Sequence, residues 1–191
     1  FLPASRNYDL FSGFVQADIP LVEDRLRLTL GSKFEHNDFT GIEVLPGGRL
    51  LWMPHNRHAV WTAISRAVRL PTRAESDGQL IQEVRPVLVG SDSVLSIVKI
   101  MGDEDFESEE LVAVEGGYRT RPTDWLTLDL AAFYNFYDNL RTGEPRTVVA
   151  DNTTSPPRLL VPVEADNKAS ARTFGLEEAV DWQPLDGWRL R

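Results

Sequence analysis

The fold is decided by residues 8–37, which read YDLFSGFVQADIPLVEDRLRLTLGSKFEHN. In the second half of this stretch, Leu26, Leu28 and Leu30 would share one face, and the polar residues between them would share the other. Such alternation is typical of a β-strand whose two faces meet different surroundings. The polar joint at residues 22–25 is typical of a tight turn, so the stretch predicts an antiparallel hairpin.

Both arms of this hairpin are long. Strands of water-soluble proteins usually have about 5–6 residues, whereas a tilted strand needs roughly 9–11 residues to cross a bilayer. The same alternation returns along the chain, at residues 58–69, 109–119, 126–137 and 169–182. The sequence therefore predicts an all-β protein, an antiparallel up-and-down meander that forms a segment of a large transmembrane β-barrel.

Composition narrows the class of protein further. The chain has 191 residues, enough for one domain, and 42% of them are hydrophobic. No apolar run approaches the roughly 20 residues of a spanning helix, but alternation in barrel strands dilutes hydropathy and leaves a barrel possible. The formal net charge of −9 argues against a nucleic-acid partner, since nucleic acids bind basic surfaces. The absence of cysteine excludes disulfides and thiol chemistry.

The connections between the expected strands alternate in length. Short connections lie at residues 21–25, 54–57, 121–124 and 183–187, and longer ones at residues 39–47, 70–107 and 142–168. This alternation is expected when one end of every hairpin faces a confined compartment and the other faces the outside. We therefore expect residues 70–107 and 142–168 to be long outer loops, the second with one short strand at residues 158–163.

The first of these loops has structure of its own in the sequence. Two apolar runs, at residues 82–89 and 94–101, are separated by a short polar joint and predict a hairpin. Pro86 lacks a backbone N–H, so the first run should lie at the edge of its sheet. Long loops that carry structure are usually functional.

Six phrases of the sequence resemble the C-terminal β-barrel of TonB-dependent outer-membrane receptors. They are FVQADIPL and LRLTLGSKFE (residues 14–21 and 26–35), SRAVRLPTR (65–73), ELVAVEGGYR (110–119), FYNFYDNL (133–140) and ARTFGLE (171–177). Each phrase is weak alone, but six in the family's order and at its spacing form a specific pattern. The resemblance implies a barrel of about 22 strands with a plugged lumen, of which residues 1–191 supply about eight wall strands.

The resemblance also implies a function. The expected activity is active uptake of a scarce nutrient, a ferric siderophore or related metal chelate, across the outer membrane of a Gram-negative bacterium. The implied partners are outer-membrane lipid, the receptor's plug domain and remaining barrel strands, and the TonB complex. The plug, the TonB-contacting segment and the terminal aromatic strand are missing from this sequence. Since it also begins at Phe1 without a leader, we expect a fragment of a longer receptor.

Two alternatives remain open. A soluble secreted β-sheet binding domain would be favoured by short strands and two packed layers. A non-transport outer-membrane barrel, an adhesin or an enzyme, is disfavoured because the sequence shows no serine–histidine–acid arrangement, phosphate-binding glycine loop or close acidic pair. We therefore expect neither an enzyme nor a bound cofactor.

The candidate ligand-facing residues are Arg66 and Arg69, in the basic stretch that approaches the outer rim. Their guanidinium groups could bind an anionic chelate through bidentate hydrogen bonds. The alternative, which we prefer, is that they pair with carboxylates of the lumen, such as those of Glu35 or Glu115.

Metal binding is disfavoured at both places where the sequence suggests it. His55 and His58 have a usable spacing, but no third ligand is near them, which favours an ordinary polar turn. The acidic run at residues 103–110 offers oxygen ligands for calcium. It lacks the glycine-punctuated pattern of an EF-hand, and a solvated loop is the preferred interpretation. We expect no metal site.

Overall fold

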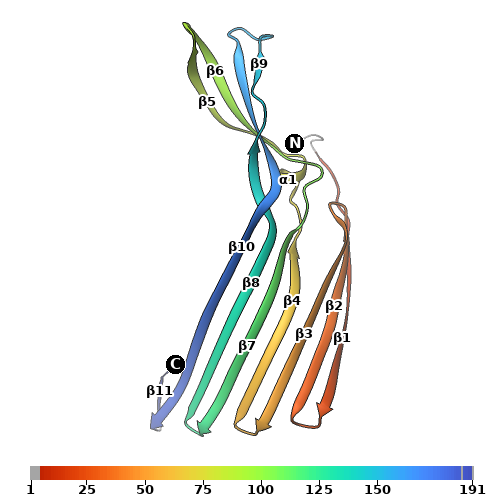
Figure 1. The fold of residues 1–191 in the computed structure, drawn as a ribbon, viewed down its shortest axis with the longest axis vertical. Helices are drawn as coiled ribbons and strands as arrows, with labels where there is room; N and C mark the ends of the chain where they lie inside the picture. The colour runs from red at the N-terminus through yellow and green to blue at the C-terminus, as the bar shows by residue number, and fades with distance from the viewer. Residues whose placement is uncertain (1–4, 186, 191) are drawn as a thin grey trace.

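The computed structural model describes residues 5–185 and 187–190, which form a single β-sheet with the strand order β1-β2-β3-β4-β7-β8-β10-β6-β5. The long strands are tilted side by side in one open layer (Figure 1). They are β1 (Leu10–Val22), β2 (Leu26–Asn37), β3 (Gly41–His55), β4 (His58–Arg69), β7 (Glu109–Thr123), β8 (Leu126–Pro145) and β10 (Arg158–Leu185). This layer is the antiparallel meander that the sequence predicted.

The remaining elements are smaller or lie beyond the wall. At the end of the wall opposite the short turns stand α1 (Arg73–Ser76), β5 (Gln79–Val89), β6 (Asp92–Met101) and β9 (Val149–Asp151). At the other end, β11 (Trp188–Leu190) pairs with the last part of β10. Asp186, in the predicted final turn, lies outside the described residues. Among the described residues, no helix is long and apolar enough to cross a membrane.

The register of the ladders places apolar residues in continuous rows. Leu28 of β2 lies opposite Ile19 of β1 and opposite Leu50 of β3. Residues directly opposite each other in an antiparallel ladder share a face, so these side chains form one row on the same side of the sheet. Towards the other edge of the sheet, Tyr134 of β8 lies opposite Phe174 of β10, and their rings stack with centroids 6.0 Å apart.

The wall has no hydrophobic core of its own. Among the described residues, the buried hydrophobic side chains are those of Ile97, Phe106 and Ala165, and all three belong to the end with the long connections. On the apolar face of the wall, Phe174 is 77% exposed and Leu176 is 69% exposed. No second layer of described residues covers that face, so it requires apolar surroundings. The described residues thus form one layer, not the two packed layers of a soluble β-sandwich.

The prediction of a long connection at residues 39–47 was wrong. Only a tight turn separates β2 from β3, because the Asn37 side chain accepts hydrogen bonds from the backbone N–H groups of Phe39 and Thr40, both at 2.9 Å. Gly41 then has a φ of +78° and starts β3. Pro46 is tolerated within β3 because the ladder between β3 and β4 ends at the neighbouring pair Gly47–Ser65.

The second expected loop, at residues 142–168, is largely sheet. Strand β8 extends to Pro145, and β10 begins at Arg158, so only residues 146–157 connect them. The hairpin expected in the first loop is present as β5 and β6, and it confirms the edge position of Pro86 because β5 ends the strand order. The first part of β10, residues 158–164, pairs in parallel with β6 and so joins the second expected loop to the hairpin of the first.

Candidate functional site at the outer rim

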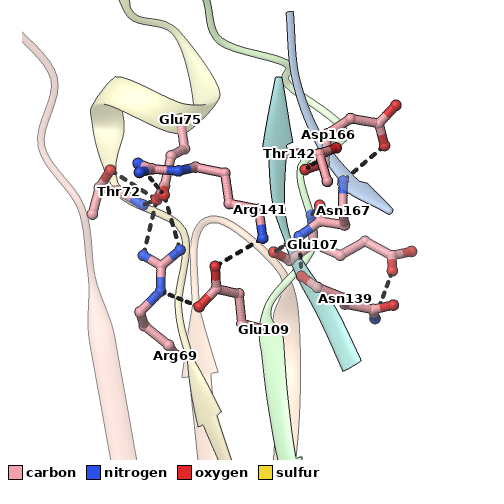
Figure 2. A network of polar contacts seen from close by, with 10 residues as sticks. All are labelled: Arg69, Thr72, Glu75, Glu107, Glu109, Asn139, Arg141, Thr142, Asp166 and Asn167. Atoms are coloured by element: carbon pink, nitrogen blue, oxygen red, sulfur yellow. Dashed lines mark hydrogen bonds and ion pairs between the residues drawn. The ribbon is translucent and has the colours of Figure 1, made fainter. Parts of the chain in front are cut away.

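We call residues 70–108, which contain α1, β5 and β6, the insertion. A network of charged and polar side chains lies where the wall meets the insertion (Figure 2). We call this place the outer rim. It brings together Arg69 at the end of β4, Glu75 of α1, Glu109 at the start of β7 and Arg141 of β8. These residues come from four different elements, so the network fixes how the segment with α1, β5 and β6 leaves the wall.

Glu75 is the centre of this network, and it is buried. Its carboxylate accepts hydrogen bonds from both terminal nitrogens of Arg69, at 3.0 and 2.8 Å, and from Arg141 Nη1 at 3.3 Å. The backbone N–H and the hydroxyl of Thr72 also donate to it, each at 2.9 Å. Burial raises the pKa of Glu75, but the hydrogen bonds from Arg69 and Thr72 outweigh it and bring the pKa to about 2.

Arg69 also links α1 to the wall. Its Nε donates to Glu109 Oε2 at 2.7 Å, while the other edge of the guanidinium holds Glu75. Glu109 in turn accepts from the backbone N–H of Arg141 at 3.0 Å. One arginine therefore joins three segments, the helix, the start of β7 and the upper part of β8.

Arg66 connects β3 and β4 at the point where these two strands stop pairing. Beyond Gly47 and Ser65 the two strands no longer pair. Arg66 Nη1 donates to the Val44 carbonyl at 2.6 Å, and Nη2 contacts Glu110 at 2.6 Å and Glu43 at 3.4 Å. Its side chain replaces the lost ladder bonds and joins β3, β4 and β7.

The end of the insertion is anchored separately. Ser108, which is buried, donates its hydroxyl to Glu43 Oε1 at 2.7 Å. Thr40 donates to the same oxygen at 2.9 Å, so the turn between β2 and β3 holds the residues that lead into β7. Thus Glu43 is a buried carboxylate that is satisfied by hydroxyl groups and by Arg66.

A third set of contacts joins the insertion to β8 and β10. The backbone N–H of Glu107 donates to Asn167 Oδ1 at 2.8 Å, and Asn167 Nδ2 donates to the Asn139 carbonyl at 2.7 Å. Asn139 has a positive φ of 53° and donates its side-chain amide to Glu107 Oε2 at 3.1 Å. The outer rim is therefore a clamp made from several independent points.

Both predicted ligand-facing residues belong to this clamp. Arg66 and Arg69 lie at the outer rim, and each guanidinium is engaged by carboxylates. The partners are not the suggested Glu35 or Glu115; Glu35 pairs with Lys33. Direct contact of either arginine with a ligand stays a prediction.

Sequence reasoning missed Glu75, Glu43 and Arg141. One signal was available, since Thr72 and Glu75 stand at the spacing of a helix capping box just after Pro71. Ser108 and Arg66, which bind Glu43, and Glu75, which binds Arg141, lie more than 20 residues from these side chains in the sequence, and no local pattern indicates the pairings.

His55 and His58 lie at a short turn at the opposite end of the wall. Their ring centroids are 6.5 Å apart, and His58 Nδ1 is 2.6 Å from the Tyr118 hydroxyl. Among residues 5–185 and 187–190, no three histidine or acidic side chains are grouped closely enough to hold a metal ion.

The chain belongs to the TonB-dependent receptor family. A family model described as TonB dependent receptor-like, beta-barrel, matches residues 2–191. The match spans almost the whole chain and agrees with the one-layered wall of long strands. No curated protein sequence matches the chain.

Solved structures show the same fold. A mutant of the ferric enterobactin receptor PfeA from Pseudomonas aeruginosa, in complex with enterobactin, has a TM-score of 0.78 at 22% identity, over 94% of this chain and 25% of that one. The siderophore receptor PirA from Acinetobacter baumannii has a TM-score of 0.76 at 15% identity, over 95% of this chain and 27% of that one. The outer membrane transporter YddB from Escherichia coli has a TM-score of 0.66 at 10% identity, over 92% and 22%. The chain thus spans about a quarter of the length of these proteins.

Proposed function

We propose that the chain is part of the wall of an outer-membrane receptor that takes up a ferric siderophore or related metal chelate in a TonB-dependent manner. The observation that carries this proposal is a single layer of long strands with an exposed apolar face, in a chain that belongs to the TonB-dependent receptor family. Of the solved proteins of this fold, PfeA is described as a ferric enterobactin receptor and PirA as a siderophore receptor.

The two faces of the wall suggest two kinds of partner. The face with Leu28, Leu50 and Phe174 would meet the hydrocarbon of the outer membrane. The opposite face carries charged pairs, such as Arg119 with Asp129, and would line a lumen that is filled by the receptor's plug domain. Energy for uptake would come from the TonB complex acting on that plug.

The outer rim would position the mouth of the receptor. The clamp around Glu75 holds the hairpin of β5 and β6 above the wall, where an arriving chelate would first meet the protein. Arg66 and Arg69 would stabilise this mouth, and either could contact the chelate after releasing a carboxylate.

Uptake of radioactive iron by cells tests the proposal. We expect cells that lack this receptor to lose the uptake of at least one chelate from a panel of ferric siderophores. A plasmid copy should restore uptake only when TonB is present. Unchanged uptake of every chelate in the deletion strain, under iron limitation, would contradict the proposal.

A further inference from the structure

The negative charge of the chain is concentrated at one end. Residues 33–43, 66–110 and 138–168 contain 18 acidic and ten basic residues, a formal charge of −8 out of the −9 of the whole chain. The ladders bring these segments to the same end of the wall, since Asn37 pairs with Gly41 and Glu110 with Asp138. We call this region the acidic mouth (top of Figure 1).

The basic residues of the acidic mouth are already neutralised. In the part of the chain that the structure describes, all except Lys99 lie within 4 Å of a carboxylate. Arg66 and Arg69 each contact two carboxylates. A guanidinium that binds an anionic ligand must offer free donors, so these arginines would have to give up a carboxylate first.

Several carboxylates, in contrast, have no basic partner. Among the described residues of the acidic mouth, they are Asp38, Asp92, Asp103, Glu104, Asp105, Glu107 and Asp138, none of which forms an ion pair. Four of them lie in the short segment at residues 102–108 that leads from β6 to β7. The negative charge of these unpaired carboxylates is therefore not neutralised within the clamp and lies at the rim.

A hollow of about 410 Å³ lies beside this segment. Among the described residues, five carboxylates line it and no basic residue does. Arg66 pairs with Glu43 and Glu110 from outside the lining, which leaves Glu104, Asp105 and Glu107 without a basic partner. Charges of one sign around a concave surface raise the local concentration of ligands of opposite sign and repel ligands of the same sign. The field acts over roughly 8 Å at physiological ionic strength, so an approaching chelate would feel it before contact.

We propose that the acidic mouth selects for a metal chelate without net negative charge, neutral or cationic, against an anionic one. This inference rests on the proposed function, because it assumes that a chelate enters from this end. It names the class of cargo, which neither the fold nor the family membership specifies.

A matched pair of probes tests the inference. One is a ferric trihydroxamate that ends in an ammonium group, and the other is the same chelate with that amine succinylated so that it ends in a carboxylate. We expect the intact receptor, purified in detergent, to bind the ammonium form roughly tenfold faster at low salt. The difference should shrink as ionic strength rises. Equal or faster binding of the carboxylate form would overturn the inference.

Variants show where the selectivity arises. Removing two charges from the mouth, with Glu104→Gln and Asp105→Asn, should reduce the preference severalfold. The control removes two charges at the opposite end of the wall, with Glu23→Gln and Asp24→Asn, and should leave the preference unchanged. An equal effect of both variants would also overturn the inference.

The proposed function is tested separately in cells. If the purified receptor prefers the ammonium form but no chelate enters cells in a TonB-dependent manner, the proposed transport fails while the charge preference stands. If uptake occurs but favours the carboxylate form, the charge inference fails and the transport function stands.

Discussion

At the residue scale, Glu75 shows how much a single buried carboxylate can organise. It is held by two arginines and by Thr72, and it joins α1 to β4 and β8. A buried carboxylate costs free energy unless hydrogen bonds compensate it. Here the compensation comes from three different segments, so the same bonds that satisfy Glu75 also fix the insertion.

The clamp should weaken when this charge is removed. We expect Glu75→Gln to destabilise the insertion locally by about 1–3 kcal/mol, because charge-assisted bonds from Arg69 and Arg141 are lost. Hydrogen exchange of the α1 amides in the intact receptor would measure the change. The control is Glu83→Gln, which removes an exposed partner 3.7 Å from Arg85 and should cost less than about 0.5 kcal/mol. Equal exchange in both variants would contradict the central place of Glu75.

The clamp should also depend on pH in a defined direction. The pKa of Glu75 lies at about 2, below its ordinary value of 4.5. Its contribution to stability, at most about 3 kcal/mol, is therefore complete above the ordinary pKa and is lost as pH falls through about 2. Proteolysis by pepsin, which works in acid, would measure this. We expect the native insertion to become as sensitive as that of Glu75→Gln only at the acid end of this window.

On the polar face, Trp61 shows a close fit between an aromatic ring and a glycine. Trp61 of β4 lies opposite Gly117 of β7, and the Arg49 guanidinium lies 5.0 Å from the centre of its ring. A Cβ at residue 117 would lie 2.5 Å from the indole Nε1. The ring can lie flat against the wall only because residue 117 has no side chain.

A methyl group at this position should therefore displace the indole. We expect Gly117→Ala to destabilise the intact receptor by about 1–3 kcal/mol, as overpacked sites do. The midpoint of urea unfolding in lipid vesicles would measure the loss. Gly13→Ala is the matched control, because a Cβ there meets no atom within 4 Å. A similar midpoint for both variants would show that the ring moves aside freely.

At the element scale, the strands follow from the alternation of side chains, and the errors lie where that alternation is interrupted. A short strand at residues 158–163 and a separate strand from residue 169 were expected, but both belong to one continuous strand, β10, that begins at Arg158. The ladder with β8 shifts register between Asp166 and Ala169 and again before Ala171. Each irregularity breaks the period of two, so the upper part of the strand could not be connected to the lower part from sequence.

The prediction of a loop between β2 and β3 was wrong for a different reason. Gly41, Pro46 and Gly47 are ordinary signals of a loop, but the Asn37 side chain closes the turn before them. Arg66 then satisfies the Val44 carbonyl where the ladder with β4 stops. That compensation comes from a residue of the next strand, and no local pattern predicts it.

The insertion is held together by β6, which lies between two strands. Ile97 is buried, opposite Val84 of β5 and Leu160 of β10. We expect Ile97→Ala to cost about 2–4 kcal/mol of local stability and to speed proteolytic cleavage of the hairpin. Leu88→Ala, at a side chain that is 78% exposed, should have little effect. Cleavage at equal rates in both variants would show that β6 is not the central strand of the insertion.

At the scale of the whole molecule, the wall is a sheet with two unlike faces, and the described residues form no second layer. The side chains of Ile64 and Ala63 are neighbours in β4 and therefore lie on opposite faces. Ile64 continues the apolar row, opposite Gly48 and Val114, and is 55% exposed. Ala63 lies opposite Arg49 and Glu115, on the polar face. Two adjacent residues thus test the assignment of lipid and lumen.

An arginine introduced at each position should have unequal effects. Ile64→Arg would place a charge in hydrocarbon, which costs about 2–4 kcal/mol near the middle of the bilayer and less near its surfaces. Ala63→Arg would place the same group between Arg49 and Glu115, where the Glu115 carboxylate can pair with it and offset the repulsion from Arg49. We expect the intact receptor with Ile64→Arg to fold less efficiently into lipid vesicles, whereas Ala63→Arg should fold nearly as the native protein does. If Ala63→Arg is the more damaging change, the apolar rows do not face lipid, and the wall must be covered by protein instead.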